Sequence, residues 1–145
     1  MSGSRVYVES SALLRALLDG DDAAKAAIDD AESLCASELT FLEASRAIIR
    51  AKHTGRLDAK QARRLAREIA AVERECDLVA VGESVLRKAR EEFPVEPLRT
   101  LDAIHLATIR ILDEELGDVV VASCDDRVRE NVEALGIALV PVVAR

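Results

Sequence analysis

The sequence predicts an α/β fold, a three-layer α/β/α domain with a central, mainly parallel sheet. Short apolar segments rich in β-branched residues alternate with longer amphipathic segments, as in strands joined by covering helices. The segment 119–122 is apolar throughout, which is typical of a parallel strand buried on both faces. The chain has 145 residues, 50% of them hydrophobic, enough for one core. We therefore expect a single domain over residues 1–145.

The first elements are predicted to be a strand, a turn and a helix. Residues 5–8 are apolar and β-rich, and Ser10 or Ser11 is a suitable N-cap for a helix over 12–18. The acidic turn 19–22 ends that helix and begins another. The elements expected next are a strand at 34–36, a helix from Ser37 or Thr40 to Lys52, a helix over 58–71 and a strand over 76–81.

The second half of the chain continues this alternation. Thr100 is expected to cap an apolar helix. Gly136 is expected to end the last helix, because glycine readily adopts the left-handed conformation found there. The predicted elements are helices over 83–92, 100–112 and 125–135 and strands over 119–122 and 138–140.

Composition excludes several classes of protein. The net charge is −7, so the overall field does not attract nucleic acid. Aromatic residues make up 2% of the chain and Trp is absent, which argues against the base-stacking platforms of common RNA-binding domains. Cys35, Cys76 and Cys124 are widely spaced and form no CxxC pair, which argues against a zinc site or a disulfide framework. We expect them to be small buried hydrophobes.

The sequence contains no predicted membrane or export segment. No apolar run approaches the roughly 18–20 residues of a membrane span. The first residues lead into a short apolar stretch without the h-region and cleavage site of a signal peptide. We therefore expect a soluble, cytoplasmic protein that makes no contact with a membrane.

Basic residues gather in one segment despite the acidic total. Between residues 44 and 67, one acid, Asp58, stands against eight basic residues: Arg46, Arg50, Lys52, Arg56, Lys60, Arg63, Arg64 and Arg67. The segment either holds RNA phosphates, which would make affinity salt-dependent, or forms two solvated helix faces. Arg46 and Arg50 follow Glu43 at one-turn intervals, so they are the candidates for the mouth of a site.

Four acids stand out by their positions. Glu9 directly follows the first strand, and Asp125 follows the strand 119–122 by a short turn. Glu43 interrupts an apolar run near the start of its helix, and Asp102 lies in the first turn of an apolar helix. Each of them, taken alone, is also explained as a turn, cap or helix-dipole acid, a stabilisation of about 0.3–1 kcal/mol.

Taken together, the four acids predict a metal site. Ligand chemistry in an open parallel sheet collects at the carboxyl ends of the strands, so they are expected to converge there. Packed carboxylates repel one another unless cations neutralise them. An oxygen-only ligand set suits Mg²⁺ or Mn²⁺, and such ions generate hydroxide and stabilise in-line displacement at phosphorus. The residues therefore predict hydrolysis of a phosphodiester.

The segments around these acids resemble the four motifs of PIN-domain proteins, in order and over nearly the whole chain. The third, LRTLDAIHLA over residues 98–107, is the most specific. The other matching segments are 6–13, 37–43 and 123–127, the last followed by 134–137. They place the motif acids on Glu9, Glu43, Asp102 and Asp125.

By size and by its third motif, the chain is most similar to VapC-like toxins. The resemblance implies a Mg²⁺- or Mn²⁺-dependent endoribonuclease that is the toxin of a type II toxin–antitoxin pair, a homodimer inhibited by a small antitoxin protein. Glu43 would complete the acidic pocket and position the attacking water. Ser11 and Thr100 match positions that support the metal ligands by hydrogen bonding. Those ligands would be Glu9, Asp102 and Asp125.

The first motif departs from the family pattern. Its usual Asp is here Glu9, whose extra methylene moves the carboxylate by about 1 Å, and misplacement on that scale costs about a hundredfold in rate. The alternative function is therefore a catalytically weakened PIN-fold module that binds RNA or protein. A phosphoacceptor receiver domain has little support, because the Lys it needs follows no late strand. A nucleotide site lacks its glycine-rich motif.

His105 lies three residues after Asp102, on nearly the same helix face. It is a candidate catalytic residue or ligand, but a packed, hydrogen-bonded helix histidine is the simpler interpretation.

Overall fold

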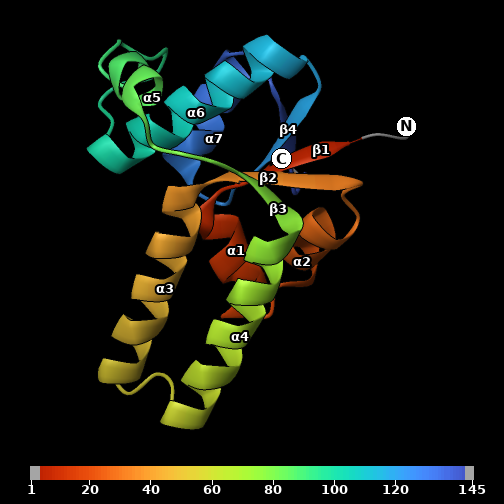
Figure 1. The fold of residues 1–145 in the computed structure, drawn as a ribbon, viewed down its shortest axis with the longest axis vertical. Coiled ribbons are helices and arrows are strands. Elements are labelled where there is room, and N and C mark those ends of the chain that lie inside the picture. Colours follow the sequence, from red (N-terminus) through yellow and green to blue (C-terminus); the bar gives the residue numbers. More distant parts are fainter. Residues whose placement is uncertain (1–3, 143–145) are drawn as a thin grey trace.

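Five parallel strands form the central layer of the molecule (Figure 1). The computed structural model describes residues 4–142. The strands are β1 (Arg5–Val8), β2 (Ser33–Ser37), β3 (Cys76–Val79), β4 (Val119–Ala122) and β5 (Ala138–Val140). Their order in the sheet is β3-β2-β1-β4-β5, and each neighbouring pair is parallel.

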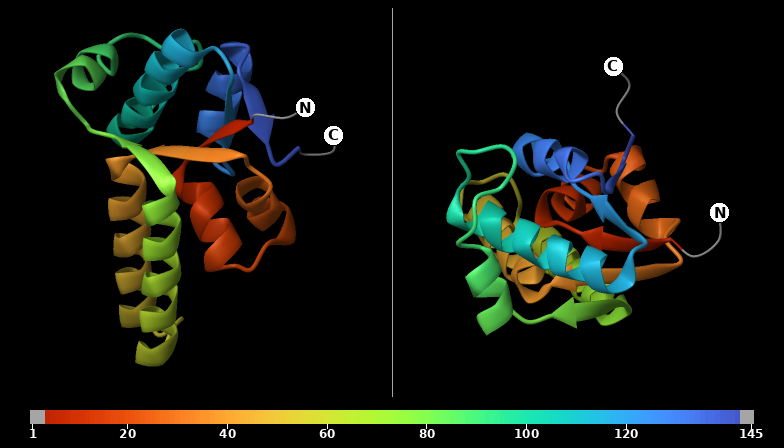
Figure 2. Two further views of the ribbon diagram at one scale, coloured as in Figure 1. Left: turned by 45° about the vertical axis from the view of Figure 1, so that its right-hand side comes forward. Right: turned by 90° about the horizontal axis from the view of Figure 1, so that it is seen from above.

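Helices cover both faces of this sheet, which confirms the predicted three-layer α/β/α fold. In Figure 2, α1–α4 lie on one face and α5–α7 on the other. The helices are α1 (Ser10–Leu17), α2 (Asp22–Asp29), α3 (Glu38–His53), α4 (Ala59–Glu75), α5 (Glu83–Lys88), α6 (Thr100–Leu116) and α7 (Asp126–Ala134).

The central strand β1 contributes to two hydrophobic cores, because its side chains alternate between the faces of the sheet. Val6 and Val8 are buried in the core under α1–α4. Tyr7 is fully buried in the other core, beneath α6 and α7. The strand is thus covered on both faces, as expected for a parallel sheet.

The carboxyl ends of β1 and β4 are in register. Val8 lies opposite Ala122, and the backbone N–H of Glu9 donates to the carbonyl of Ala122 at 3.0 Å. The hydroxyl of Thr40 donates to the carbonyl of Val8 at 2.8 Å, which ties the start of α3 to the same place. Three elements therefore meet at the residue that follows β1.

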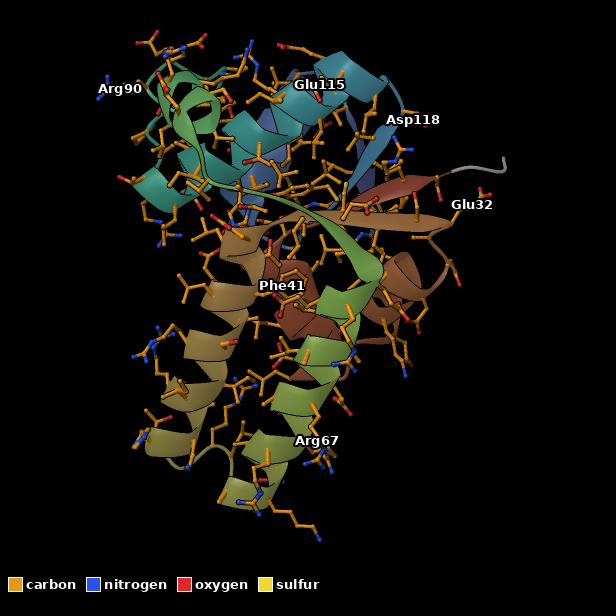
Figure 3. All side chains as sticks on the ribbon, viewed as in Figure 1. Glu32, Phe41, Arg67, Arg90, Glu115 and Asp118 are labelled. Carbon is orange, nitrogen blue, oxygen red and sulfur yellow. The ribbon has the colours of Figure 1, made fainter. Side chains whose placement is uncertain are left out.

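Helices α3 and α4 pack against each other and extend beyond the sheet as a two-helix arm (Figure 1), here called the α3–α4 arm. Ile48, Leu65 and Ile69 are buried in its interior, continuous with the core under the sheet. Figure 3 shows Phe41 on the inner side of α3 and Arg67 on the outer side of α4.

The structure corrects two predicted helix caps. The N-cap of α1 is Glu9, whose carboxylate accepts from the N–H of Ser11, so neither Ser10 nor Ser11 caps the helix. The N-cap of α6 is Arg99. Thr100 is the first residue of the helix, and no side chain makes a capping hydrogen bond there. Glu9 takes the capping position because β1 ends one residue before it.

Several predicted boundaries also shift. The strand β3 ends at Val79, not at residue 81, because its partner β2 ends at Ser37, opposite Val79. Helix α4 continues past residue 71, to Glu75, and Val72 packs on the core. Helix α6 continues to Leu116, and Gly117 caps it with a left-handed φ of 77°. Helix α5 is shorter than predicted. Within residues 4–142, no helix is long and apolar enough to cross a membrane.

Candidate active site

The four acids predicted from the sequence lie at the carboxyl end of the sheet and are linked through shared neighbours. Glu9 follows β1, and Asp125 follows β4 as the N-cap of α7. Glu43 lies in the second turn of α3, which follows β2 directly. Asp102 lies in the first turn of α6. Glu9 and Glu43 share a serine hydroxyl, Glu43 and Asp102 share a pocket, and Asp102 and Asp125 share an arginine.

Glu9 is held by four hydrogen bonds. Its Oε2 accepts from the hydroxyl of Ser10 at 2.9 Å and from the backbone N–H of Ser11 at 3.0 Å. Its Oε1 accepts from the hydroxyl of Ser123 at 2.6 Å and from that of Ser11. A carboxylate offers about four lone-pair sites, so both oxygens are fully used. These bonds stabilise a carboxylate that is only 5% exposed.

Ser10 connects Glu9 to Glu43. Its hydroxyl lies 2.9 Å from Oε2 of Glu9 and 3.1 Å from Oε1 of Glu43, and its one proton can bond to either. The same Oε1 lies 2.5 Å from Nε2 of His105. The other ring nitrogen of His105, Nδ1, lies 2.7 Å from the hydroxyl of Tyr7. Glu43 therefore ends a chain of contacts that begins in the core.

Asp102 and Asp125 share one positive group. The Nε of Arg99 donates to Oδ2 of Asp102 at 3.3 Å, and its guanidinium lies 3.9 Å from Oδ2 of Asp125. The other oxygen of Asp125 accepts from the backbone N–H groups of Arg127 and Val128 and so caps α7. Each aspartate thus directs one oxygen toward a cation.

A pocket of about 230 Å³ opens beside these groups. Glu43 and Asp102 both line it, although they come from helices on opposite faces of the sheet. The other lining residues are Arg99, Thr100 and Leu101. Arg46 and Arg50, the candidates for the mouth of the site, are exposed further along α3 and do not line this pocket.

The donor chemistry of this edge fits a hard divalent cation, which prefers carboxylate oxygens. Asp102 and Asp125 already converge on one positive group, the guanidinium of Arg99. Within residues 4–142, however, no three acidic, histidine or cysteine side chains are placed to hold an ion as they stand. Glu9 could join a cation only if the serine hydroxyls turned away from its oxygens.

The cysteines are not candidates for this chemistry. Cys35 is buried, as predicted, whereas Cys76 and Cys124 are only partly buried. Burial raises the pKa of the Cys35 thiol to about 11 and that of the Cys76 thiol to about 12. Burial also raises the pKa of Cys124. Thiols in this state are protonated at neutral pH and are poor nucleophiles and metal ligands.

Comparison with known proteins assigns the chain to a family. Residues 6–133 match the model of the PIN domain. The chain belongs to the PIN-domain family. It is 32% identical to ribonuclease VapC46 of Mycobacterium tuberculosis, over 93% of this chain and 95% of that protein.

Two solved structures have a similar fold. PAE2754 from Pyrobaculum aerophilum has a TM-score of 0.64 and 22% identity, over 94% of this chain and 84% of that one. A toxin–antitoxin complex from Klebsiella pneumoniae has a TM-score of 0.63 and 16% identity, over 96% of this chain and 99% of that one.

Sequence reasoning missed several residues of this PIN domain's acidic edge. It did not identify Arg99 as the cation shared by two acids, or Ser123 and Ser10 as donors to acids. Ser123 follows β4 as Glu9 follows β1, so the parallel pairing of these strands could have revealed it. No sequence pattern pointed to Tyr7. His105 is buried and hydrogen-bonded, as the simpler interpretation expects, and one of its two partners is the site residue Glu43.

Proposed function

We propose that this PIN-domain protein is a divalent-metal-dependent endoribonuclease and the toxin of a toxin–antitoxin pair. The observation that carries the proposal is the edge itself, where Asp102 and Asp125 converge on one positive group and Glu43 shares a pocket with Asp102. The relationship to ribonuclease VapC46 supports RNA as the substrate.

The aspartates are the proposed core of the metal site. Asp102 and Asp125 would hold Mg²⁺ or Mn²⁺, with Glu9 as a third ligand once its serine partners reorient. When bound, the ion supplies a hydroxide nucleophile at neutral pH and neutralises charge at the phosphorus. Arg99 offsets part of the negative charge of the two aspartates, which limits their repulsion.

Glu43 is proposed to position the attacking water. Its side chain is about one-quarter exposed and lines the pocket, so it reaches solvent while one oxygen is fixed by His105. A carboxylate with one oxygen held and the other directed to solvent is suited to orient a water molecule and accept its proton.

The α3–α4 arm is the proposed contact for RNA phosphates. Its basic residues are exposed, and most of them form no ion pair in the described part of the chain; Arg56, which pairs with Asp19, is the exception. Nitrogen atoms gather on the outer sides of both helices in Figure 3. Such groups would attract the RNA backbone toward an otherwise acidic molecule.

The proposed partners follow from the same relationships. A small antitoxin protein would inhibit the enzyme, since one fold neighbour comes from a toxin–antitoxin complex. A homodimer is the proposed assembly of the free toxin, in a soluble, cytoplasmic setting.

The substitution Asp102→Asn tests the metal site. It keeps the shape of the side chain but removes the charge, so RNA cleavage should fall by about a hundredfold or more with the loss of several kcal/mol of transition-state stabilisation. The melting temperature should stay close to that of the unmodified protein. Asp113→Asn, on the same helix but away from the pocket, is the control and should cut normally. Full activity of Asp102→Asn would contradict the site assignment.

The substitutions Arg46→Gln and Arg50→Gln test the arm. Each should weaken RNA binding and reduce the slope of log affinity against log salt by roughly 0.7, the value for one lost phosphate contact on a single strand. Fluorescence anisotropy at several salt concentrations, in the Asp102→Asn background, measures both quantities without cleavage. Arg87→Gln removes an exposed arginine that pairs with Glu83 on α5 and serves as the control. Equal slopes for all variants would show that the arm does not bind phosphates.

A second candidate function is supported by the surroundings of Glu9. Because both its oxygens are fully hydrogen-bonded and buried, Glu9 is also well suited to a structural role. The protein would then be a PIN-fold module that binds RNA or protein with little or no catalysis.

The variant Glu9→Asp distinguishes the two candidates. If the unmodified protein binds without catalysis, restoring the family's usual Asp should raise the rate of metal-dependent RNA cleavage by about a hundredfold. If Glu9 is a working ligand, the unmodified protein cuts RNA and the variant offers no comparable gain. Cleavage of a labelled RNA with Mn²⁺ measures this, and Glu115→Asp on the exposed face of α6 is the matched control.

A further inference from the structure

A continuous hydrogen-bonded chain crosses the sheet edge from the core to the pocket. It starts at the hydroxyl of Tyr7 on β1, passes through both ring nitrogens of His105 on α6, and ends at Oε1 of Glu43 on α3. Tyr7 is fully buried and His105 is 1% exposed, whereas the Glu43 side chain lines the pocket. These contacts therefore join the central strand to α6, and α6 to α3, a helix on the opposite face of the sheet.

We infer that Tyr7 and His105 are positioning residues that fix which oxygen of Glu43 faces the reaction. This inference rests on the proposed function, since it assigns Glu43 its orientation in that site. Oε1 is held by Nε2 of His105, and the hydroxyl of Ser10 lies 3.1 Å from it. Oε2 accepts no hydrogen bond from any residue in the range 4–142, so it is the oxygen left for water.

The protons in this chain have a defined direction. Burial, and after it the charge of Glu9, raises the pKa of Tyr7 well above its ordinary value, while a backbone hydrogen bond with Ser37 opposes the shift. The carboxylate of Glu43 only accepts hydrogen bonds, so the ring nitrogen that faces it, Nε2 of His105, carries a proton and donates. Nδ1 is then the acceptor for the O–H of Tyr7. Tyr7 in this way supports the tautomer that holds the carboxylate.

The geometry explains why a histidine is needed at this position. The ring must reach one partner on β1 and another on α3 at the same time, and only its two nitrogens, at opposite edges of a rigid ring, meet both. The Tyr7 and His105 rings lie nearly perpendicular, with centroids 6.0 Å apart, so packing also fixes the imidazole.

The ring tautomer can be measured directly, without nuclease activity. Long-range ¹H–¹⁵N NMR spectra of the intact protein should show His105 in the neutral form with its proton on Nε2. His53, the other histidine, is exposed at the end of α3 and serves as the internal reference. Tyr7→Phe should shift the ¹⁵N resonance of Nδ1, because Nδ1 loses its hydrogen-bond donor, while the proton stays on Nε2 beside the carboxylate. A proton on Nδ1 in the unmodified protein would overturn the inference, whatever the protein's activity.

The kinetic test separates positioning from folding. Tyr7→Phe should lower kcat for RNA cleavage by about tenfold, the lower end of the range for residues that orient a catalytic ligand, and leave KM unchanged. Thr108→Val is the matched control, because it deletes another buried hydroxyl on α6 that bonds only to the carbonyl of Ile104. It should change neither constant. An unchanged kcat in Tyr7→Phe, or an equal loss in Thr108→Val, would contradict the positioning role.

Discussion

Four carboxylates at one edge of a parallel sheet repel one another, and the surrounding structure is arranged to hold them there. The carboxylate of Glu9 is stabilised by hydrogen bonds from three serine hydroxyls and a backbone N–H. Arg99 lies beside the two aspartates, and the imidazole of His105 hydrogen-bonds to Glu43. Hydroxyl groups, a guanidinium group and an imidazole thus stabilise the four acids.

These donors differ in how easily they give way. The contacts of Arg99 are long, and its side chain is largely exposed, so a divalent ion can replace it at little cost. The bonds to Glu9 are buried, and breaking them leaves hydroxyls that need new partners. The edge therefore combines an exchangeable cation position, at the two aspartates, with a fixed scaffold around the end of β1. This contrast explains why both catalysis and a binding role can be argued for one site.

The sequence alone predicts the layers and the acids but not the contacts between them. The apolar segment 119–122 and the alternation of elements are local patterns, and both indicate the fold correctly. The pairing of Tyr7 with His105 joins residues 98 positions apart, so it depends on which strand lies under α6. The sequence did not predict Glu9 as a cap, because serine is the commoner N-cap residue. Glu9 caps α1 because β1 ends at Val8, one residue before it. Both the Tyr7–His105 contact and the cap of α1 therefore depend on tertiary packing.

The central claim is that this acidic edge works as a metal-dependent nuclease site. The most direct measurement is cleavage of a labelled single-stranded RNA by the unmodified protein with Mg²⁺ or Mn²⁺, compared with the same reaction in EDTA. The account predicts internal cleavage that requires the ion and stops in the chelator. Intact RNA under both conditions, or cleavage that continues in EDTA, would contradict it.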